Sequence, residues 1–429
     1  MRILVIGAYG LIGGYVTARL LGDGHEVVGV GRDIAAAKRR FPAVRWVRAD
    51  LRRMTPADWA PWLDGVGAVV NCAGALQDSP RDSLVAVHLT AVSALARACK
   101  DAGVSRFVQI SAAGVERNTG RFQATKLAAD QALQRSDLEW IILRPGLVLA
   151  PAAYGGSALL RGLAALPGVI PALNADAPVQ VVSVEDLAEA VARSVRPATP
   201  SRFVCDLVSA EKTRLKDILV ALRGWLGLPP ARLVAIPPWF GAIMATLADG
   251  LAWLGWRSPM RTTAMRQLSA GVGGHSEDAQ VRLGFAPRPL AEMLSGWPSG
   301  VQDRWFSQLY FLKPVALTVL AGFWAVSGLI GFTSHAAATR LLTDAGLPQD
   351  LAAAVVLAGS ILDLAIAALV CVRRTAVLSL QLMLLATAGY LVAASVWLPS
   401  LWQDPLGPLV KSIPAALLAL VALAMMDER

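Results

Sequence analysis

The sequence predicts an α/β Rossmann fold, a doubly wound parallel sheet, followed by an all-α transmembrane domain of four helices. Short β-branched apolar runs alternate with helix-length segments in the first half of the chain, and a glycine pattern follows the first run. Four long apolar segments occupy the end of the 429-residue sequence. We therefore expect an NAD(P)-binding domain at 1–225, a cap or interfacial linker at 226–312 and a membrane domain at 313–429.

The composition indicates that the chain combines a water-soluble part with a strongly apolar part. It is 55% hydrophobic and 17% charged, and its mean hydropathy of +0.51 is too high for a purely soluble protein. The formal charge of +9 is compatible with nucleic acid or an anionic membrane surface. Because apolar sequence is abundant and no basic run is interleaved with aromatic residues, the lipid bilayer is the expected partner and nucleic acid is not.

Cysteine and histidine usage argues against a metal site. The four cysteines have no CxxC spacing, and the four histidines are equally dispersed. We expect free thiols in a reducing compartment and no metal. The N-terminus has too short an apolar run for a signal peptide, which favours a cytoplasmic location for the first domain.

The first half is expected to contain six parallel strands. The apolar run at 2–8 ends in a glycine turn, and a helix follows to the turn at 22–24. Further helices are expected at 83–103 and around 122–126. The other five strands are expected at 26–32, 43–51, 67–74, 106–114 and 138–146.

The turn after the first strand has the pattern GxxGxxG. Gly7 permits a tight turn, Gly10 lets the backbone approach a pyrophosphate, and Gly13 allows close packing of helix and strand. Free N–H groups and the positive dipole end of the helix would then face the phosphates. The alternative is a glycine-rich turn without a ligand. The predicted phosphate site also includes Tyr9, Leu11 and Ile12.

The end of the second strand should contact the adenosine ribose. Arg32 suits a 2′-phosphate, whereas the next residue, Asp33, suits a free 2′-hydroxyl. Because Arg32 comes first, NADP(H) is favoured, with NAD(H) as the alternative. Asp50, with Leu51 beside it, is placed to meet the adenine edge or to cap a helix.

These residues resemble the short-chain dehydrogenase/reductase superfamily. The resemblance rests on the segment 7–13, Asn71-Cys72-Ala73-Gly74, Ser111, Lys126 and Arg144-Pro145-Gly146, and it covers roughly residues 1–225. The glycine spacing is similar to that of atypical and extended members, such as NmrA-like proteins and the NAD(P)H-binding accessory subunit of respiratory complex I. The resemblance implies that Cys72, Ala73, Gly74, Lys126 and Pro145 contact the cofactor.

In that superfamily a serine, a tyrosine and a lysine perform the chemistry. The resemblance assigns Ser111 and Lys126 to two of these roles, but Phe122 stands four residues before the lysine, where the tyrosine would be. Tyr154 is a candidate substitute acid, or a residue that only packs in its loop. His88 is expected to be a core histidine rather than a catalytic one, and Lys126 retains a role in holding the ribose or is a solvated helix residue.

Two functions remain open at this stage. One is an oxidoreductase acting on a quinone-like or other lipid-soluble substrate. The other is a catalytically inert NADP(H)-binding structural or sensor protein, and the sequence is compatible with an oligomer or a membrane complex.

The bridge contains an apolar helix with tryptophans at both ends. Apolar residues recur there at three- and four-residue steps, and Arg257 follows. They are Phe240, Ile243, Met244, Leu247, Leu251 and Leu254. The pattern predicts a helix at the lipid headgroup level or a cap over the substrate cleft.

Spans are expected at about 314–333, 351–372, 375–398 and 408–426. Arg373 and Arg374 lie in a short connector, which the positive-inside tendency places in the cytoplasm. Four spans then put both termini there, in a multi-pass protein of the inner (plasma) membrane. Asp363 falls within the second span and needs a partner, for which Gln381 is a candidate. The span count and the second helix resemble the DoxX-like membrane family.

Overall fold

The computed structural model describes residues 1–79, 82–117, 120–256, 262 and 271–426. Arg257 lies outside the described residues. The chain divides into two compact units, one of residues 1–249 and 258–307 and the other of residues 250–257 and 308–429. The domain boundaries at 225 and 312 stay predictions, and each unit is described by itself.

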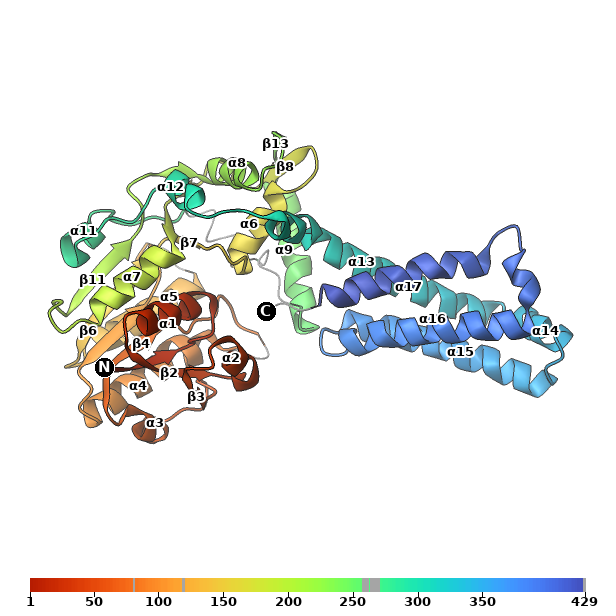
Figure 1. Cartoon of the computed structure of the whole chain (residues 1–429), viewed down its shortest axis with the longest axis horizontal. Coiled ribbons are helices and arrows are strands. Elements are labelled where there is room, and N and C mark those ends of the chain that lie inside the picture. Colours follow the sequence, from red (N-terminus) through yellow and green to blue (C-terminus); the bar gives the residue numbers. More distant parts are fainter. Residues whose placement is uncertain (80–81, 118–119, 257–261, 263–270, 427–429) are drawn as a thin grey trace. The chain divides into compact units, whose positions relative to one another are not determined.

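The first unit is built around a parallel sheet of seven strands (Figure 1). The strand order is β3-β2-β1-β4-β5-β6-β11, and all pairs are parallel. The register places Leu4 of β1 beside Val28 of β2 and Val69 of β4, so the most apolar strands are central. The strands are β1 Arg2–Ile6, β2 Glu26–Gly31, β3 Arg45–Arg48, β4 Val66–Asn71, β5 Arg106–Ile110, β6 Glu139–Pro145 and β11 Phe203–Leu207.

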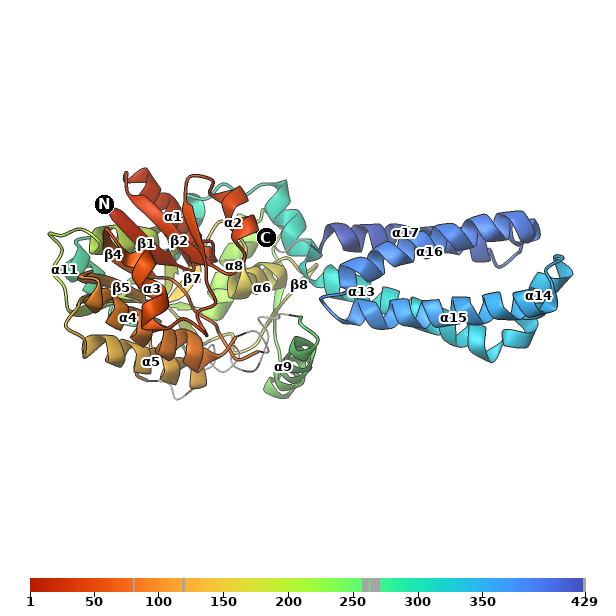
Figure 2. The same cartoon turned by 90° about the horizontal axis from the view of Figure 1, so that it is seen from below.

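Helices cover both faces of this sheet (Figures 1 and 2). One core packs the sheet against α1 Leu11–Gly22, α7 Val184–Ser194 and α11 Asp278–Leu283. The other packs it against α3 Pro56–Leu63, α4 Ala91–Asp101 and α5 Arg121–Gln134. Between β2 and β3 lies α2 Ile34–Arg40. The predicted doubly wound fold is confirmed.

Two details differ from the prediction. Six strands were expected, and the seventh, β11, pairs with β6 although more than fifty residues separate them. The helix expected at 83–103 begins with a π-helical segment, η1 Val85–Thr90, before α4. Such segments frequently occur at functional sites, and His88 lies in this one.

A third apolar core lies among the remaining elements of the first unit. Its residues include Leu149, Ile170, Leu219 and Met293. These elements lie beside the sheet and extend its carboxyl edge. Their bounds are β7 Leu147–Leu149, α6 Gly155–Ala164, β8 Val169–Ala172, β9 Pro178–Val179, β10 Val181–Ser183, β12 Thr213–Arg214, α8 Leu215–Trp225, β13 Arg232–Ala235 and α12 Leu290–Ser295. The apolar helix predicted in the bridge is α9 Pro238–Trp253.

The second unit is helical, with α13 Val301–Thr333, α14 His335–Asp344, α15 Gln349–Cys371, α16 Ala376–Trp397, η2 Pro399–Trp402 and α17 Pro408–Ala424. Among the described residues, α13, α15 and α16 are long and apolar enough to cross a membrane. The helix α17 is apolar but has only 17 residues. The short α14 was not predicted.

Asp363 is buried in the second unit and accepts two hydrogen bonds. Ser327 of α13 donates to Oδ2 at 2.6 Å, and Tyr390 of α16 donates to Oδ1 at 2.7 Å. The expected partner, Gln381, is exposed on α16. That expectation was wrong because Gln381 lies on the outward face of its helix, whereas Tyr390 reaches the carboxylate from further along it.

Candidate cofactor and active site

The glycine turn has the geometry that a dinucleotide requires. Gly7 has a φ of +72°, in the left-handed region, and a Cβ there would lie 3.2 Å from Ala73. A Cβ on Gly13 would lie 2.1 Å from the Gly7 carbonyl oxygen, so a side chain would separate α1 from β1. Gly10 precedes α1 without a side-chain cap. The unpaired N–H groups of the first helical turn, at residues 11–13, are thus available to a phosphate.

The ends of three strands and one helix meet beside this turn. Ala73 and Gly74 follow β4, and a Cβ on Gly74 would lie 3.5 Å from the Lys126 Nζ. Cys72 bonds through its backbone N–H to the Ile6 carbonyl at 3.0 Å, and burial raises the pKa of its thiol to about 12. The predicted turn residues, segment 72–74 and Lys126 therefore lie together at the carboxyl edge of the sheet, where ligands of such folds bind.

Lys126 is buried rather than solvated. Its Nζ donates to the Ile110 carbonyl at 2.8 Å, and the residue is 4% exposed. Burial lowers the pKa of Lys126 to about 8, against the opposing effect of Asp130. At neutral pH this ammonium holds a proton that it can release more readily than an ordinary lysine.

Ser111 belongs to a buried ionic cluster that sequence reasoning missed. Its hydroxyl donates to Asp130 Oδ2 at 2.8 Å, and the Arg144 guanidinium donates to the same oxygen at 3.2 Å. Asp130 is fully buried, its Oδ1 has no hydrogen-bond partner among the described residues, and burial raises its pKa. The signal available in the sequence was the four-residue step from Lys126 to Asp130, which places both on one helix face.

His88 is a satisfied core histidine, as expected. Its Nε2 accepts from the Ala75 backbone N–H at 3.1 Å, so Nδ1 carries the proton and donates to Thr125 Oγ1 at 2.9 Å. Burial lowers the pKa of His88 to about 3, with help from Lys126. The Phe122 ring packs edge-on against the imidazole with centroids 5.5 Å apart. The position that lacks a phenol therefore packs against a neutral imidazole, one helical turn before Lys126 on α5.

At the adenosine end, Arg32 is exposed after β2 and forms an ion pair with Asp82 at 2.8 Å. Asp33 caps α2 by accepting from the Ala36 N–H at 3.1 Å. This capping bond gives Asp33 a structural role that competes with binding a ribose hydroxyl.

Tyr9 and Asp50 flank the same end. The Tyr9 ring lies against Gly31, where a Cβ would be 2.1 Å from it, and its hydroxyl accepts from the Asp33 N–H at 3.3 Å. Asp50 accepts from the backbone and guanidinium of Arg52, which lowers the pKa of Asp50 to about 2. Asp50 therefore stabilises a turn, and the alternative that it caps a helix was wrong, because Thr55 precedes α3. Leu51 is half-buried beside it.

Pro145 and Tyr154 lie on separate segments, at the end of β6 and just before α6. Pro145 ends that strand, and its carbonyl accepts from the Ala113 N–H at 2.9 Å. Tyr154 precedes α6, and its side chain is 43% exposed. Tyr154 takes no part in the bonds from Ser111 and Arg144 to Asp130 or in the bond from Lys126 to the Ile110 carbonyl.

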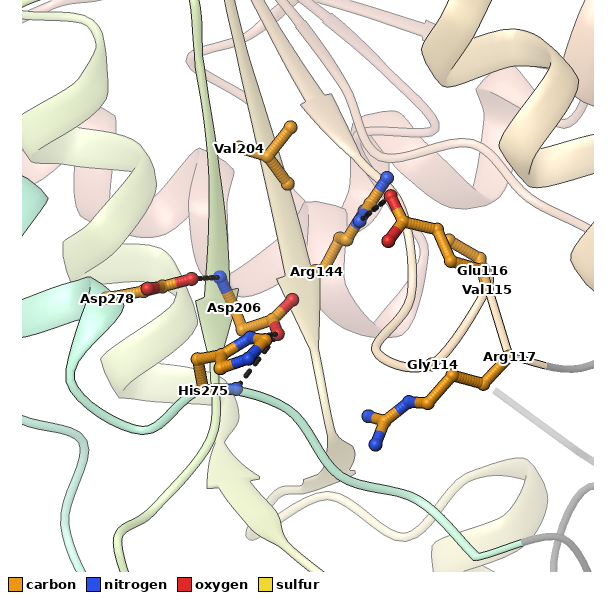
Figure 3. Close-up of a pocket in the computed structure, with 9 residues that line it drawn as sticks. All are labelled: Gly114, Val115, Glu116, Arg117, Arg144, Val204, Asp206, His275 and Asp278. Atoms are coloured by element: carbon orange, nitrogen blue, oxygen red, sulfur yellow. Dashed lines mark hydrogen bonds and ion pairs between the residues drawn. The ribbon is translucent and has the colours of Figure 1, made fainter.

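A hollow of about 390 Å³ opens at the carboxyl ends of β6 and β11 (Figure 3). Arg144 links it to the buried cluster, since its guanidinium contacts Asp130 on one side and Glu116 at 2.8 Å on the other. The loop after β5 closes another wall. The lining residues are Gly114, Val115, Glu116, Arg117, Arg144, Val204, Asp206, His275 and Asp278.

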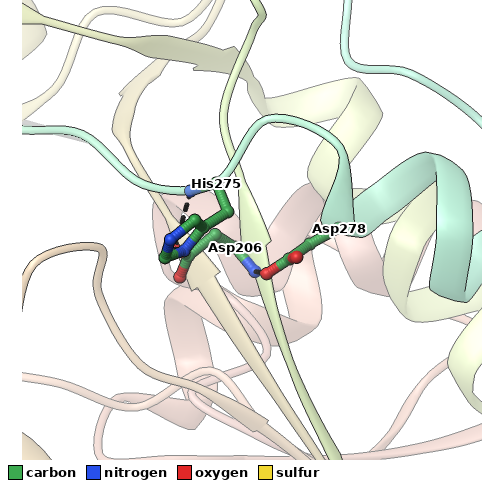
Figure 4. Close-up of side chains that lie close together, drawn as sticks. All are labelled: Asp206, His275 and Asp278. Atoms are coloured by element: carbon green, nitrogen blue, oxygen red, sulfur yellow. Dashed lines mark hydrogen bonds and ion pairs between the residues drawn. The ribbon is translucent and has the colours of Figure 1, made fainter.

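Asp206, His275 and Asp278 gather at one wall of this hollow (Figure 4). Their side-chain ligand atoms lie within 4.8 Å of one another. Backbone groups already engage the carboxylates, since Asp206 accepts from the His275 N–H at 2.9 Å and Asp278 accepts from the Asp206 N–H at 3.1 Å. These bonds fasten the segment before α11 to the end of β11.

Comparisons with known proteins match the two parts separately. A family model described as NAD(P)H-binding matches residues 7–196. A model of the DoxX-like family matches residues 321–420.

Curated relatives match over about half of the chain. An uncharacterized protein of Mycobacterium tuberculosis is 30% identical over 223 residues, which are 52% of this chain and 23% of that protein. A ceramide reductase of Caulobacter vibrioides is 28% identical over 188 residues, or 43% of this chain and 58% of the reductase. This chain thus spans less than two thirds of each of these relatives.

Solved structures show the same fold. The UDP-glucuronic acid 4-epimerase of Bacillus cereus, in complex with UDP-glucuronic acid and NAD, has a TM-score of 0.54 at 16% identity, covering 72% of this chain and 100% of that one. An NADPH-dependent quinone oxidoreductase of Escherichia coli, complexed with NADPH, has a TM-score of 0.53 at 20% identity, covering 68% and 99%. The chain therefore carries a region that matches an NAD(P)H-binding family model and has the fold of these dinucleotide-binding enzymes, followed by a region that matches the DoxX-like family model.

Proposed function

We propose that the protein is a membrane-anchored NAD(P)H-dependent oxidoreductase that acts on a quinone-like or other lipid-soluble substrate. The observation that carries this proposal is the joining of two features in one chain. A dinucleotide cradle lies beside a buried lysine of lowered pKa, and apolar helices long enough to span a bilayer follow in the same sequence. The spans keep the first unit at the membrane surface, where an apolar acceptor is concentrated.

The predicted residues fit a dinucleotide. The turn at 7–13 would hold the diphosphate, segment 72–74 with Pro145 would border the nicotinamide half, and Lys126 would hold its ribose. Arg32 would bind a 2′-phosphate, and this supports NADP(H) over NAD(H), because Asp33 is used as a helix cap. A nicotinamide held there would supply the hydride for reduction.

Reduction also requires a proton on the substrate oxygen, and Phe122 cannot give one. We assign this proton to the Lys126 ammonium, whose pKa of about 8 lies near physiological pH. The neutral amine that remains is reprotonated from solvent. Ser111 would act as a positioning residue while its hydroxyl donates to Asp130. Tyr154 is the second candidate for the acid.

The ceramide reductase and the quinone oxidoreductase among the similar proteins agree with a lipid-soluble acceptor. The test uses the full chain in lipid nanodiscs supplied with NADPH. We expect NADPH oxidation with a long-chain quinone to exceed that with a quinone lacking the tail. Equal rates with both acceptors would contradict the role of the membrane, and Lys126→Met should abolish turnover.

A second function, a catalytically inert NADP(H)-binding structural or sensor protein, is favoured by one observation. The site has no phenol at Phe122, and the Ser111 hydroxyl already serves a buried carboxylate. In that case the purified protein would hold one nucleotide per chain and turn over none of the quinone or carbonyl acceptors.

We propose the inner (plasma) membrane as the location, with the first unit and the C-terminus in the cytoplasm. The basic connector of Arg373 and Arg374 supports this orientation.

A further inference from the structure

The helix α9 presents its large apolar side chains outward and its small ones inward. Gly241, Ala245, Ala248 and Ala252 are buried, at steps of four, three and four residues. The exposed side chains are Phe240 (42%), Ile243 (49%), Leu247 (56%), Leu251 (48%) and Leu254 (41%). A helix packed only on a water-soluble domain shows the opposite arrangement.

These exposed residues form one stripe. At about 100° per residue they fall within roughly 80° of the helix circumference. Trp239 and Trp253 flank the stripe at the two ends of α9 and are 65% and 80% exposed. The single acid, Asp249, lies off the stripe and accepts a hydrogen bond from Thr262 at 2.7 Å. The stripe is therefore free of charge over its whole length.

The C-terminal end of α9 and the residues after it, 250–257, belong to the second unit. The Trp256 indole N–H donates to the Cys371 carbonyl at 2.7 Å, and the Arg373 N–H donates to the Leu254 carbonyl at 3.0 Å. The Arg373 guanidinium also lies over the Trp256 ring, 5.7 Å from its centroid. These contacts attach α9 to the connector between α15 and α16, which must lie at a membrane surface if both helices cross.

From this continuity with the membrane helices, we propose that the stripe of α9 is inserted into the interface of the same bilayer. A helix that leaves a headgroup-level connector and carries an uncharged apolar stripe buries that stripe about 5–10 Å deep, at the boundary of headgroups and acyl chains. Tryptophans at its two ends suit this level, since their rings are amphipathic. The partner is lipid, and the inference is independent of the proposed enzymatic function.

The test places a nitroxide label on the stripe in nanodiscs. The parent carries Cys371→Ala, because this cysteine is exposed, and its residual labelling is subtracted. Leu247→Cys and, separately, Ile243→Cys are labelled. Val281→Cys on α11 is the matched control, since it is an exposed apolar residue (75%) on another helix of the first unit. Collisions with oxygen, which enriches in lipid, and with a water-soluble nickel chelate are measured by power saturation.

We expect the labels at 243 and 247 to be reached severalfold more by oxygen and severalfold less by the nickel chelate than the label at 281. If the nickel chelate reaches them as well as it reaches position 281, the stripe is in water and the proposal is wrong. If both reagents are excluded, a protein covers the stripe, and the proposal is wrong for that reason.

Discussion

Phe122 and Lys126 lie one helical turn apart on α5, beside a histidine that burial keeps neutral. A phenol at position 122 would pack against the same histidine, one helical turn from the lysine. The lysine, for its part, is held by a backbone carbonyl rather than by a carboxylate. The chemistry of the site therefore depends on one missing hydroxyl and on one buried ammonium.

Restoring the hydroxyl should add a proton donor. We expect Phe122→Tyr to raise the rate of NADPH-dependent carbonyl reduction by about 100-fold or more, since a positioned acid contributes that much. Steady-state turnover with a panel of ketones measures this effect. The double variant with Lys126→Met should lose the gain, and an unchanged rate in the single variant would show that position 122 does not face the substrate.

The pH profile should follow Lys126. Its pKa is lowered to about 8, so the protonated form is complete well below pH 8 and is lost as the pH rises through that value. If this ammonium is the acid, kcat/KM for quinone reduction falls about tenfold per pH unit above 8. A profile that stays level from pH 7 to 9.5 would assign the proton to another group, of which Tyr154 is the first to examine.

Arg32 should decide between the two nucleotides. A charged hydrogen bond to the 2′-phosphate contributes about 1.5–3 kcal/mol, so Arg32→Ser should weaken NADPH binding by roughly 10–100-fold and leave NADH binding unchanged. Calorimetric titration measures both constants. Arg135→Ser, which removes an exposed charge at the end of α5, is the control. An equal loss for both nucleotides would place Arg32 away from the ribose.

At the scale of elements, the helices of the second unit are held together by close packing at small residues and by hydrogen bonds to one carboxylate. A Cβ on Gly328 of α13 would lie 2.8 Å from the Ser360 carbonyl oxygen of α15, so these two helices approach closely. Asp363 then links α15 to α13 and α16 through Ser327 and Tyr390.

Tyr390→Phe should lower the free energy of unfolding by about 0.6–1.7 kcal/mol, the usual contribution of a hydrogen bond between membrane helices. Titration with a denaturing detergent measures the change. In a double-mutant cycle with Asp363→Ala, the two losses should be less than additive. Gln381→Ala, at an exposed position of α16, should have no effect, and strict additivity of the first pair would contradict the link.

At the scale of the whole molecule, the number of crossings determines where the C-terminus lies. Within the part of the chain that the structure describes, three helices are long enough, and α17 would be about 25 Å long at 1.5 Å per residue, near the lower limit for a span. α13, by contrast, has 33 residues, or about 50 Å, so its first turns extend beyond the hydrocarbon.

We expect α17 to cross. Green fluorescent protein fused after Arg429 should then fluoresce, and alkaline phosphatase fused within the connector at 403–407 should be active, because the two positions lie on opposite sides. Fusions in the connector at 372–375 give the cytoplasmic reference. An active phosphatase after Arg429 would mean that α17 does not cross and that the two ends of the chain lie on opposite sides.

The sequence by itself determined the fold class, the glycine turn and the apolar helices, because periodicity and glycine spacing are local properties of the chain. The six predicted strands and the position of Phe122 relative to Lys126 follow from such patterns. Only the tertiary structure decided that Ser111 and Arg144 both donate to Asp130, that Tyr390 rather than Gln381 binds Asp363, and that β11 completes the sheet. These pairings join residues far apart in the chain, and side-chain direction and burial, which set the pKa of Lys126, arise only when the elements pack.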